Sequence, residues 1–227
     1  QYFDGDARRQ PTTYYGRQSG IGRTLETLHR SDGPLRVAMV GAGTGTLTTY
    51  GRPDDVFRLY ELNPAVFALA DRWFTYLQDS QAHIERITGD ARLMMEREAD
   101  QRFDVLAIDA FSSDAIPIHL ITREALALYR RHLSARGTVL FHVSNRYLDL
   151  TGIVARLAAD AGMTAVQFSD SPTDDARTYH TDWIAVTGNA EVSQQLVEAG
   201  GKVMGAAAAA AAPLWTDDHH NLFEVLY

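Results

Sequence analysis

Short, largely apolar runs alternate with amphipathic segments along most of the chain. The apolar runs predict five buried strands, at 35–40, 56–60, 83–87, 103–108 and 137–143, and two later ones at 163–168 and 183–186. Apolar residues at helical spacing predict helices over 65–77, 91–98, 122–133 and 150–161. Strands that are apolar throughout and alternate with helices predict an α/β fold, with a mostly parallel sheet covered by helices on both faces.

Two segments depart from this alternation. Residues 1–22 are polar, aromatic and rich in Gly and Thr, which predicts a loop or irregular hairpin that covers the ligand; residues 23–227 then form the α/β domain. The chain begins at Gln1 without a Met or a signal peptide, so we interpret it as a piece of a longer protein. The seven alanines at 206–212 predict a loop or short helix without a function.

Composition and charge exclude several classes of protein. The chain has 227 residues, with 21 Lys+Arg against 29 Asp+Glu, and its net charge of −8 argues against a nucleic-acid binder. The absence of Cys excludes disulfides, thiol nucleophiles and iron–sulfur ligation, and it is compatible with a cytoplasmic location. The eight His residues show no H-x-x-x-H spacing, so no metal is predicted.

The ends of the predicted strands carry the candidate chemistry, because ligands of such sheets lie beyond the carboxyl ends of the strands. The first strand ends in Gly41-Ala42-Gly43-Thr44-Gly45, a turn whose backbone can approach a ligand closely. Glu61 ends the next strand, where a carboxylate can accept both hydroxyls of a ribose. The G-x-G-x-G spacing differs from the dinucleotide fingerprint G-x-G-x-x-G. It resembles the first motif of enzymes that use S-adenosylmethionine or its relatives, and this resemblance implies an adenosine ligand without pyrophosphate.

Aspartates follow the third and fourth strands. Asp90 is either the acceptor for an adenine amino group or a helix N-cap, or both. Asp109 and Asp114 share one loop, where two carboxylates can hold an ammonium group and accept its proton; alternatively, Asp109 binds the loop backbone and Asp114 is solvated. Tyr14 and Tyr179 either place aromatic faces over a cationic ligand or are ordinary core or surface tyrosines.

Together these motifs resemble the spermidine synthase (polyamine aminopropyltransferase) family, in particular a bacterial branch whose domain often follows a membrane-spanning region. The segments that carry the resemblance are Pro11-Thr12-Thr13-Tyr14-Tyr15-Gly16, Ser19-Gly20-Ile21-Gly22, the glycine turn, the loop from Asp109 to Pro117 and Trp215-Thr216-Asp217-Asp218. The resemblance implies a Rossmann-like domain of the S-adenosylmethionine-dependent methyltransferase type. Residues 1–22 would be the remnant of a preceding β-region.

The resemblance also implies a reaction and its residues. An aminopropyl group would pass from decarboxylated S-adenosylmethionine to a primary amine such as putrescine, with Asp114 as general base and Asp109 as its partner. Tyr14 and Tyr179 would contact the amine. The residues that would bind the donor are Gln1, Gly41, Gly43, Gly45, Glu61, Asp90 and Ala91. A homodimer without metal is expected, in the cytoplasm or tethered to a membrane through a longer parent protein.

Three departures keep other functions open. Thr44 stands where characterised members carry an acid, the Asp109 loop is longer by two residues, and the segment from His142 to Asn145 lacks the usual Gln or Glu. One alternative is a methyltransferase that uses S-adenosylmethionine itself, although Met39 occupies the position where such enzymes usually carry an acid. The other is a non-catalytic module that binds a nucleoside or polyamine.

Overall fold

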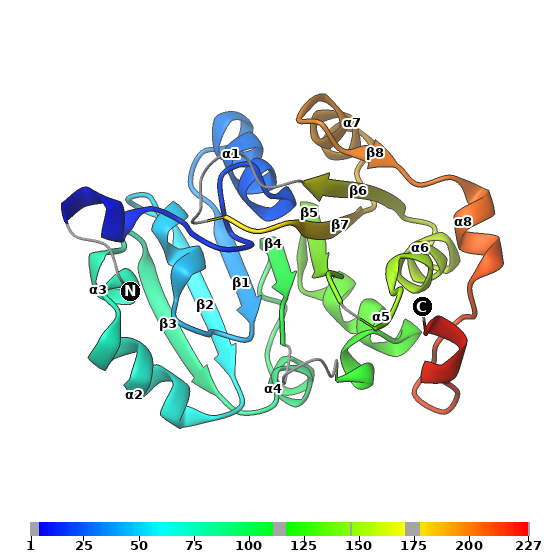
Figure 1. Ribbon diagram of the computed structural model, residues 1–227, viewed down its shortest axis with the longest axis horizontal. Coiled ribbons are helices and arrows are strands. Elements are labelled where there is room, and N and C mark those ends of the chain that lie inside the picture. The colour runs from blue at the N-terminus through cyan, green and yellow to red at the C-terminus, as the bar shows by residue number, and fades with distance from the viewer. Residues whose placement is uncertain (1–4, 111–116, 146, 171–177, 227) are drawn as a thin grey trace.

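An eight-stranded sheet forms the centre of the protein (Figure 1). The computed structural model describes residues 5–110, 117–145, 147–170 and 178–226. The strands are β1 (Arg36–Val40), β2 (Val56–Glu61), β3 (His83–Thr88), β4 (Phe103–Ile108), β5 (Leu133–His142), β6 (Thr164–Asp170), β7 (Thr181–Thr187) and β8 (Lys202–Val203). Their order in the sheet is β3-β2-β1-β4-β5-β7-β6-β8. The first five pair in parallel, whereas β7 runs antiparallel to β5 and β6. The predicted fold class is confirmed.

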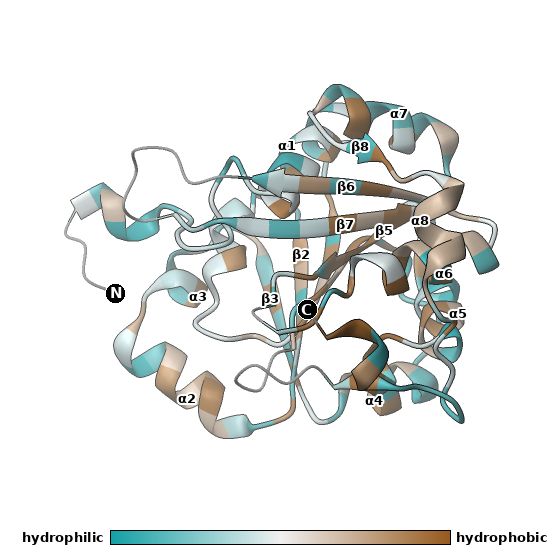
Figure 2. Cartoon of the chain, turned by 45° about the vertical axis from the view of Figure 1, so that its right-hand side comes forward, coloured by the Kyte–Doolittle hydropathy of each residue, from teal (hydrophilic) through white to brown (hydrophobic). Residues whose placement is uncertain are grey.

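Helices cover both faces of the sheet. They are α1 (Gly20–Asp32), α2 (Pro64–Trp73), α3 (Tyr76–Asp79), α4 (Ala91–Arg97), α5 (Arg123–Arg131), α6 (Thr151–Asp160), α7 (Ala190–Glu198) and α8 (Ala206–Ala211). In β1, Val37 and Met39 pack on the face with α1, α2 and α7, and Ala38 and Val40 pack on the face with α4, α5 and α6. The sheet is therefore apolar on both sides. In Figure 2, β5 is mostly coloured as hydrophobic, whereas α7 carries both hydrophobic and hydrophilic colours.

The apolar pattern did not predict α1 or α7. The two glycines at the start of α1 are typical of a loop. In the structure, however, Ser19 caps the helix by accepting a hydrogen bond from the Gly22 amide. A Cβ at Gly20 would lie 2.7 Å from the Trp183 Cβ and 2.8 Å from the Phe168 Cβ. Gly20 is thus needed for close packing of α1 on the sheet, so the prediction of a loop or hairpin up to residue 22 was wrong at its end.

The predicted helix over 65–77 is divided into α2 and α3. Phe74 is extended, with φ −131° and ψ 159°, and it ends α2. The turn that follows brings Tyr76 and Leu77 into the core, where both are buried. In a continuous helix Tyr76 would lie on the side opposite to the buried Phe67, so tertiary packing overrides the local pattern.

The alanine run forms α8, which packs against α6 at the opposite end of the molecule from α2 and α3 (Figure 1). Ala209 is buried there. None of the helices in the described ranges is both long and apolar enough to cross a bilayer.

The strand register aligns four carboxyl ends at one edge of the sheet. Val40 pairs with Tyr60 on one side and with Ile108 on the other, and Glu61 pairs with Thr88. The residues that follow these strand ends therefore meet at this edge.

Candidate functional site

A cavity of about 410 Å³ opens beyond the carboxyl ends of β1 to β4. This volume lies within the range of small-molecule sites, roughly 300–1,000 Å³. Of the residues predicted to form the site, those that line the cavity are Tyr14, Gly41, Gly43, Glu61, Asp90, Ala91 and Asp109. The structure thus brings together residues from four different strand ends.

The glycine turn follows β1 and forms one wall of the cavity. Gly41, Gly43 and Gly45 have positive φ angles of 92°, 51° and 83°. A Cβ at Gly41 would lie 2.4 Å from the carbonyl oxygen of Asp109, so this position requires glycine. Gly45 does not line the cavity, and a Cβ there would lie 2.5 Å from Cδ2 of Leu77.

Glu61 is held in place by backbone amides. Its Oε2 accepts a hydrogen bond from the Ala42 amide in the glycine turn at 3.1 Å, and its Oε1 accepts one from the Asn63 amide at 3.0 Å. The side chain is only partly buried and lines the cavity. Since each carboxylate oxygen can accept more than one hydrogen bond, the fixed carboxylate keeps capacity for a ligand hydroxyl.

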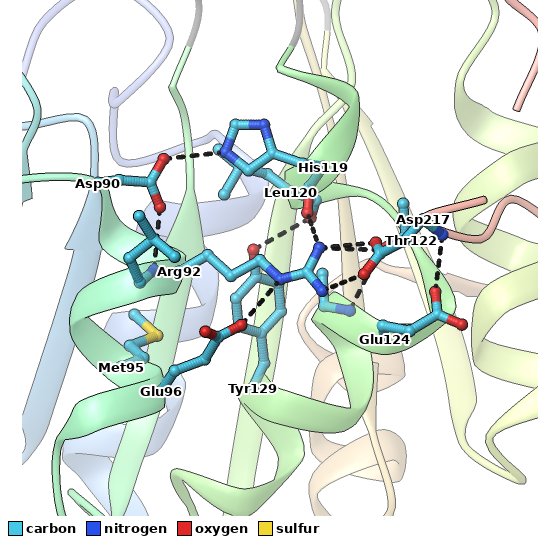
Figure 3. Close-up of polar contacts among 12 residues, drawn as sticks. Asp90, Arg92, Met95, Glu96, His119, Leu120, Thr122, Glu124, Tyr129 and Asp217 are labelled. Carbon is cyan, nitrogen blue, oxygen red and sulfur yellow. Dashed lines mark hydrogen bonds and ion pairs between the residues drawn. The ribbon is translucent and has the colours of Figure 1, made fainter. Parts of the chain in front are cut away.

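Asp90 caps α4 and also contacts a histidine. Its Oδ1 accepts a hydrogen bond from the Leu93 amide at 3.0 Å, which confirms the predicted N-cap. Its Oδ2 lies 3.1 Å from Nε2 of His119 (Figure 3). His119 lines the same cavity and was not predicted as a site residue, because nothing in its local sequence indicates a partner so far along the chain.

Asp109 is buried and has partners on both oxygens. Its Oδ1 lies 2.7 Å from Nδ1 of His142, and its Oδ2 accepts a hydrogen bond from the Tyr15 hydroxyl. The His142 ring is stacked between the rings of Tyr14 and Trp183, with centroid distances of 4.7 and 4.6 Å. The carboxylate is therefore fixed by this cluster of Tyr14, Tyr15, Asp109, His142 and Trp183, which we call the Asp109 cluster.

Burial in the Asp109 cluster keeps its tyrosines protonated. Burial and, secondly, the charge of Asp109 raise the pKa of Tyr14 from 10.0 to about 12. The same causes raise the pKa of Tyr15 well above its usual value. Neither hydroxyl serves as a base at neutral pH, and both remain hydrogen-bond donors.

These shifts predict a loss of stability at alkaline pH. Below about pH 10 the tyrosines are protonated in both states, but above it the unfolded chain releases protons that the folded chain retains. The free energy of unfolding should therefore fall as the pH rises from 10.0 through the raised Tyr14 pKa of about 12. Urea denaturation at a series of pH values measures this fall. Tyr14→Phe should make it shallower, and an equally steep fall in that variant would contradict the assignment.

Tyr15→Phe tests the cluster at neutral pH. The substitution removes the hydroxyl that donates to Asp109 and leaves one oxygen of a buried carboxylate without that partner. We expect a loss of about 1–3 kcal/mol in the free energy of unfolding, measured by urea denaturation. Tyr147→Phe, at an exposed tyrosine, should change stability little. Equal effects of the two substitutions would mean that the hydrogen bond contributes nothing.

Besides Gly45, three predicted residues are not described as lining the cavity. Tyr179 follows the bridge between Thr13 and Thr178, the residue is 59% exposed, and it does not line the cavity. Gln1 and Asp114 lie outside the described residues. Within the described ranges, no group of three or more His, Asp or Glu side chains is arranged to hold a metal ion.

Comparisons with known proteins agree with the motifs. No family model matches the chain. A polyamine aminopropyltransferase of Vibrio vulnificus is 34% identical over 126 residues, which are 53% of this chain and 41% of the relative. The matched region thus spans about two fifths of that relative's length. The predicted resemblance to polyamine aminopropyltransferases is confirmed at the level of sequence similarity.

Solved structures share the fold. A protein described as a "probable spermidine synthase" from Corynebacterium glutamicum has a TM-score of 0.66 at 16% identity, covering 98% of this chain and 84% of its own. Human methyltransferase-like protein 13, in complex with SAH, has a TM-score of 0.57 at 17% identity, covering 87% and 91%. The architecture is thus common to aminopropyltransferases and methyltransferases, and it does not by itself choose between them.

Proposed function

We propose that the protein transfers an aminopropyl group from decarboxylated S-adenosylmethionine to a primary amine such as putrescine. The observation that carries the proposal is the Glu61 carboxylate, fixed by the glycine turn at the wall of a cavity that Asp90 and Asp109 also line. The sequence similarity to a polyamine aminopropyltransferase supports this choice among the functions that the fold allows.

The donor nucleoside would occupy the cavity between the ends of β1, β2 and β3. The free lone pairs of Glu61 are suited to the two ribose hydroxyls, and Asp90 is suited to the amino group of adenine. Apolar wall residues, among them Leu62, Ala91 and Leu120, offer surfaces for the purine ring.

The reaction needs little more than alignment and a base. The amine nitrogen attacks the aminopropyl carbon attached to sulfur, a C–N bond forms, and the C–S bond breaks with its electron pair passing to sulfur. The sulfonium becomes the neutral thioether of methylthioadenosine, and the new ammonium gives one proton to Asp114. Because the leaving sulfur is already cationic, no acid is required to assist its departure.

The amine would lie on the side of the Asp109 cluster. Tyr14 lines the cavity there, and an aromatic face attracts an ammonium group. Both oxygens of Asp109 already have partners in Tyr15 and His142. Asp109 is therefore suited to attract and orient the ammonium group, whereas we assign proton transfer to Asp114.

Incubation with decarboxylated S-adenosylmethionine and putrescine tests the proposal. Mass spectrometry should detect methylthioadenosine and spermidine in equal amounts. Donor binding without either product would overturn the proposal and favour a non-catalytic module.

A methyltransferase is the second candidate, favoured by one observation. Thr44 stands in the glycine turn where an acid would hold the donor's ammonium, and its hydroxyl lies 2.8 Å from that of Thr46. Calorimetry with S-adenosylmethionine and its decarboxylated form separates the two candidates. Tighter binding of the decarboxylated donor supports the aminopropyltransferase, because the additional carboxylate would meet Asp109 and Asp114.

A further inference from the structure

His119 stands between the nucleoside cavity and a second cavity. It lines both, as does Asp90, and the second cavity has a volume of about 710 Å³. The residue belongs to a short 3-10 helix, Ile118–Leu120, that directly follows Pro117. Its imidazole points toward Asp90, the N-cap residue of α4 (Figure 3).

A clamp centred on Arg92 fixes the backbone of His119. Nη1 of Arg92 donates to the carbonyl oxygen of His119 at 2.8 Å and to Oδ1 of Asp217 at 2.7 Å, and Nη2 donates to the second Asp217 oxygen. The Thr122 hydroxyl donates to Asp217 at 2.8 Å, and Glu124 accepts a hydrogen bond from the Asp217 amide at 3.0 Å. Figure 3 shows the guanidinium between these partners. A bidentate Arg–carboxylate pair fixes the orientation of the guanidinium. The Arg92 guanidinium in turn holds the backbone carbonyl of His119 in place.

The chemistry of the contact fixes the direction of its hydrogen bond. An ionised carboxylate only accepts, so Nε2 of His119 carries the proton that it donates to Asp90 Oδ2. Together with the Leu93 amide on Oδ1, this donor holds the Asp90 carboxylate at both oxygens. Such a carboxylate presents fixed acceptor lone pairs to the cavity and no donor.

We propose that His119 is a specificity-determining residue for the base of the donor. By orienting Asp90 as an acceptor, it favours a purine with a 6-amino group over one with a 6-oxo group, whose oxygen would face the carboxylate. This inference rests on the proposed function, which places a nucleoside in the cavity.

Calorimetric titration with methylthioadenosine and its 6-oxo analogue, methylthioinosine, tests the inference. The wild-type protein should prefer methylthioadenosine by at least about tenfold, because a site built to pair with a polar group rejects the analogue that lacks it. His119→Ala should weaken methylthioadenosine binding by about tenfold and reduce the preference to about threefold or less. His119→Gln, whose amide can still donate to Asp90, should restore most of the preference.

His180→Ala is the matched control. His180 pairs with Asp182 at the same 3.1 Å and is similarly exposed, with side-chain exposures of 55% for His180 and 49% for His119. Neither His180 nor Asp182 lines the cavity, so the control should leave both affinities unchanged.

The clamp can be tested in the same way with a second matched pair. Asp217→Asn removes the negative charge and one of the two acceptor oxygens that Arg92 contacts. Asp71→Asn does the same to the bidentate pair with Arg86 of β3. The side chains of Asp217 and Asp71 are 39% and 37% exposed. Only Asp217→Asn should lower the preference for the 6-amino base.

The outcomes separate the two proposals. Failure of the wild-type protein to bind either nucleoside would overturn the proposed function and the inference with it. Binding of methylthioadenosine with the same preference in His119→Ala as in the wild type would overturn the inference alone.

Discussion

Asp114→Asn should lower turnover by about 10²- to 10⁴-fold, the range that a positioned general base contributes. The isosteric amide cannot accept the proton of the attacking amine, but it leaves the ribose and adenine contacts untouched. Methylthioadenosine affinity should therefore stay within about twofold of the wild type. Steady-state assays and calorimetry on the same preparation measure both quantities.

Asp114 lies outside the described residues, but the described residues on either side of 111–116 support its place in the site. Ala110 and Pro117 both line the nucleoside cavity. Asp160→Asn, at an exposed aspartate that ends α6, is the control and should keep full turnover. Parallel losses of binding and turnover in Asp114→Asn would show that the loop is structural and contains no base.

Glu61→Gln should weaken methylthioadenosine binding by about 10- to 100-fold. Hydrogen bonds to a charged group contribute about 1.5–3 kcal/mol each, and the amide can accept on one side only. The amide also puts an N–H group near the backbone amides of Ala42 and Asn63, which now donate to the carboxylate. Calorimetry measures the affinity, and thermal unfolding checks that the variant keeps its fold.

Glu191→Gln provides the comparison for this substitution. Glu191 lies on α7 and is not among the residues that line the nucleoside cavity. Its carboxylate pairs with the Arg136 guanidinium at 2.7 Å. Its substitution should leave the affinity unchanged. Equal affinities of Glu61→Gln and the wild type would remove the ribose role of Glu61.

The sequence was sufficient to predict seven of the eight strands, β8 being the exception, and the edge of the sheet where the candidate cavity lies. Apolar runs are a strong signal for buried strands, and strand ends such as Glu61 and Asp109 follow directly from them. Helix boundaries were harder to predict where tertiary contacts determine where a helix begins or ends. From the sequence alone, Gly20 suggests a loop. In the structure it begins a helix, and only a glycine fits there because Trp183 and Phe168 lie so close.

The partners of the predicted site residues could not be derived from the sequence. His142 lies next to the last residue of the strand predicted at 137–143, and that position was a usable signal. Its hydrogen bond to Asp109 links the ends of β4 and β5, whose pairing the apolar pattern leaves open. The contact between His119 and Asp90 joins residues 29 positions apart, and that between Arg92 and Asp217 joins residues 125 positions apart. Such pairs depend on packing of separate elements, which local pattern does not encode.

A crystal structure of the protein, from crystals soaked with methylthioadenosine, would show whether Glu61 binds the ribose. We expect the ribose hydroxyls within hydrogen-bonding distance of the Glu61 carboxylate and the adenine amino group beside Asp90. A nucleoside bound elsewhere, or a Glu61 side chain turned away from the ribose, would contradict this expectation.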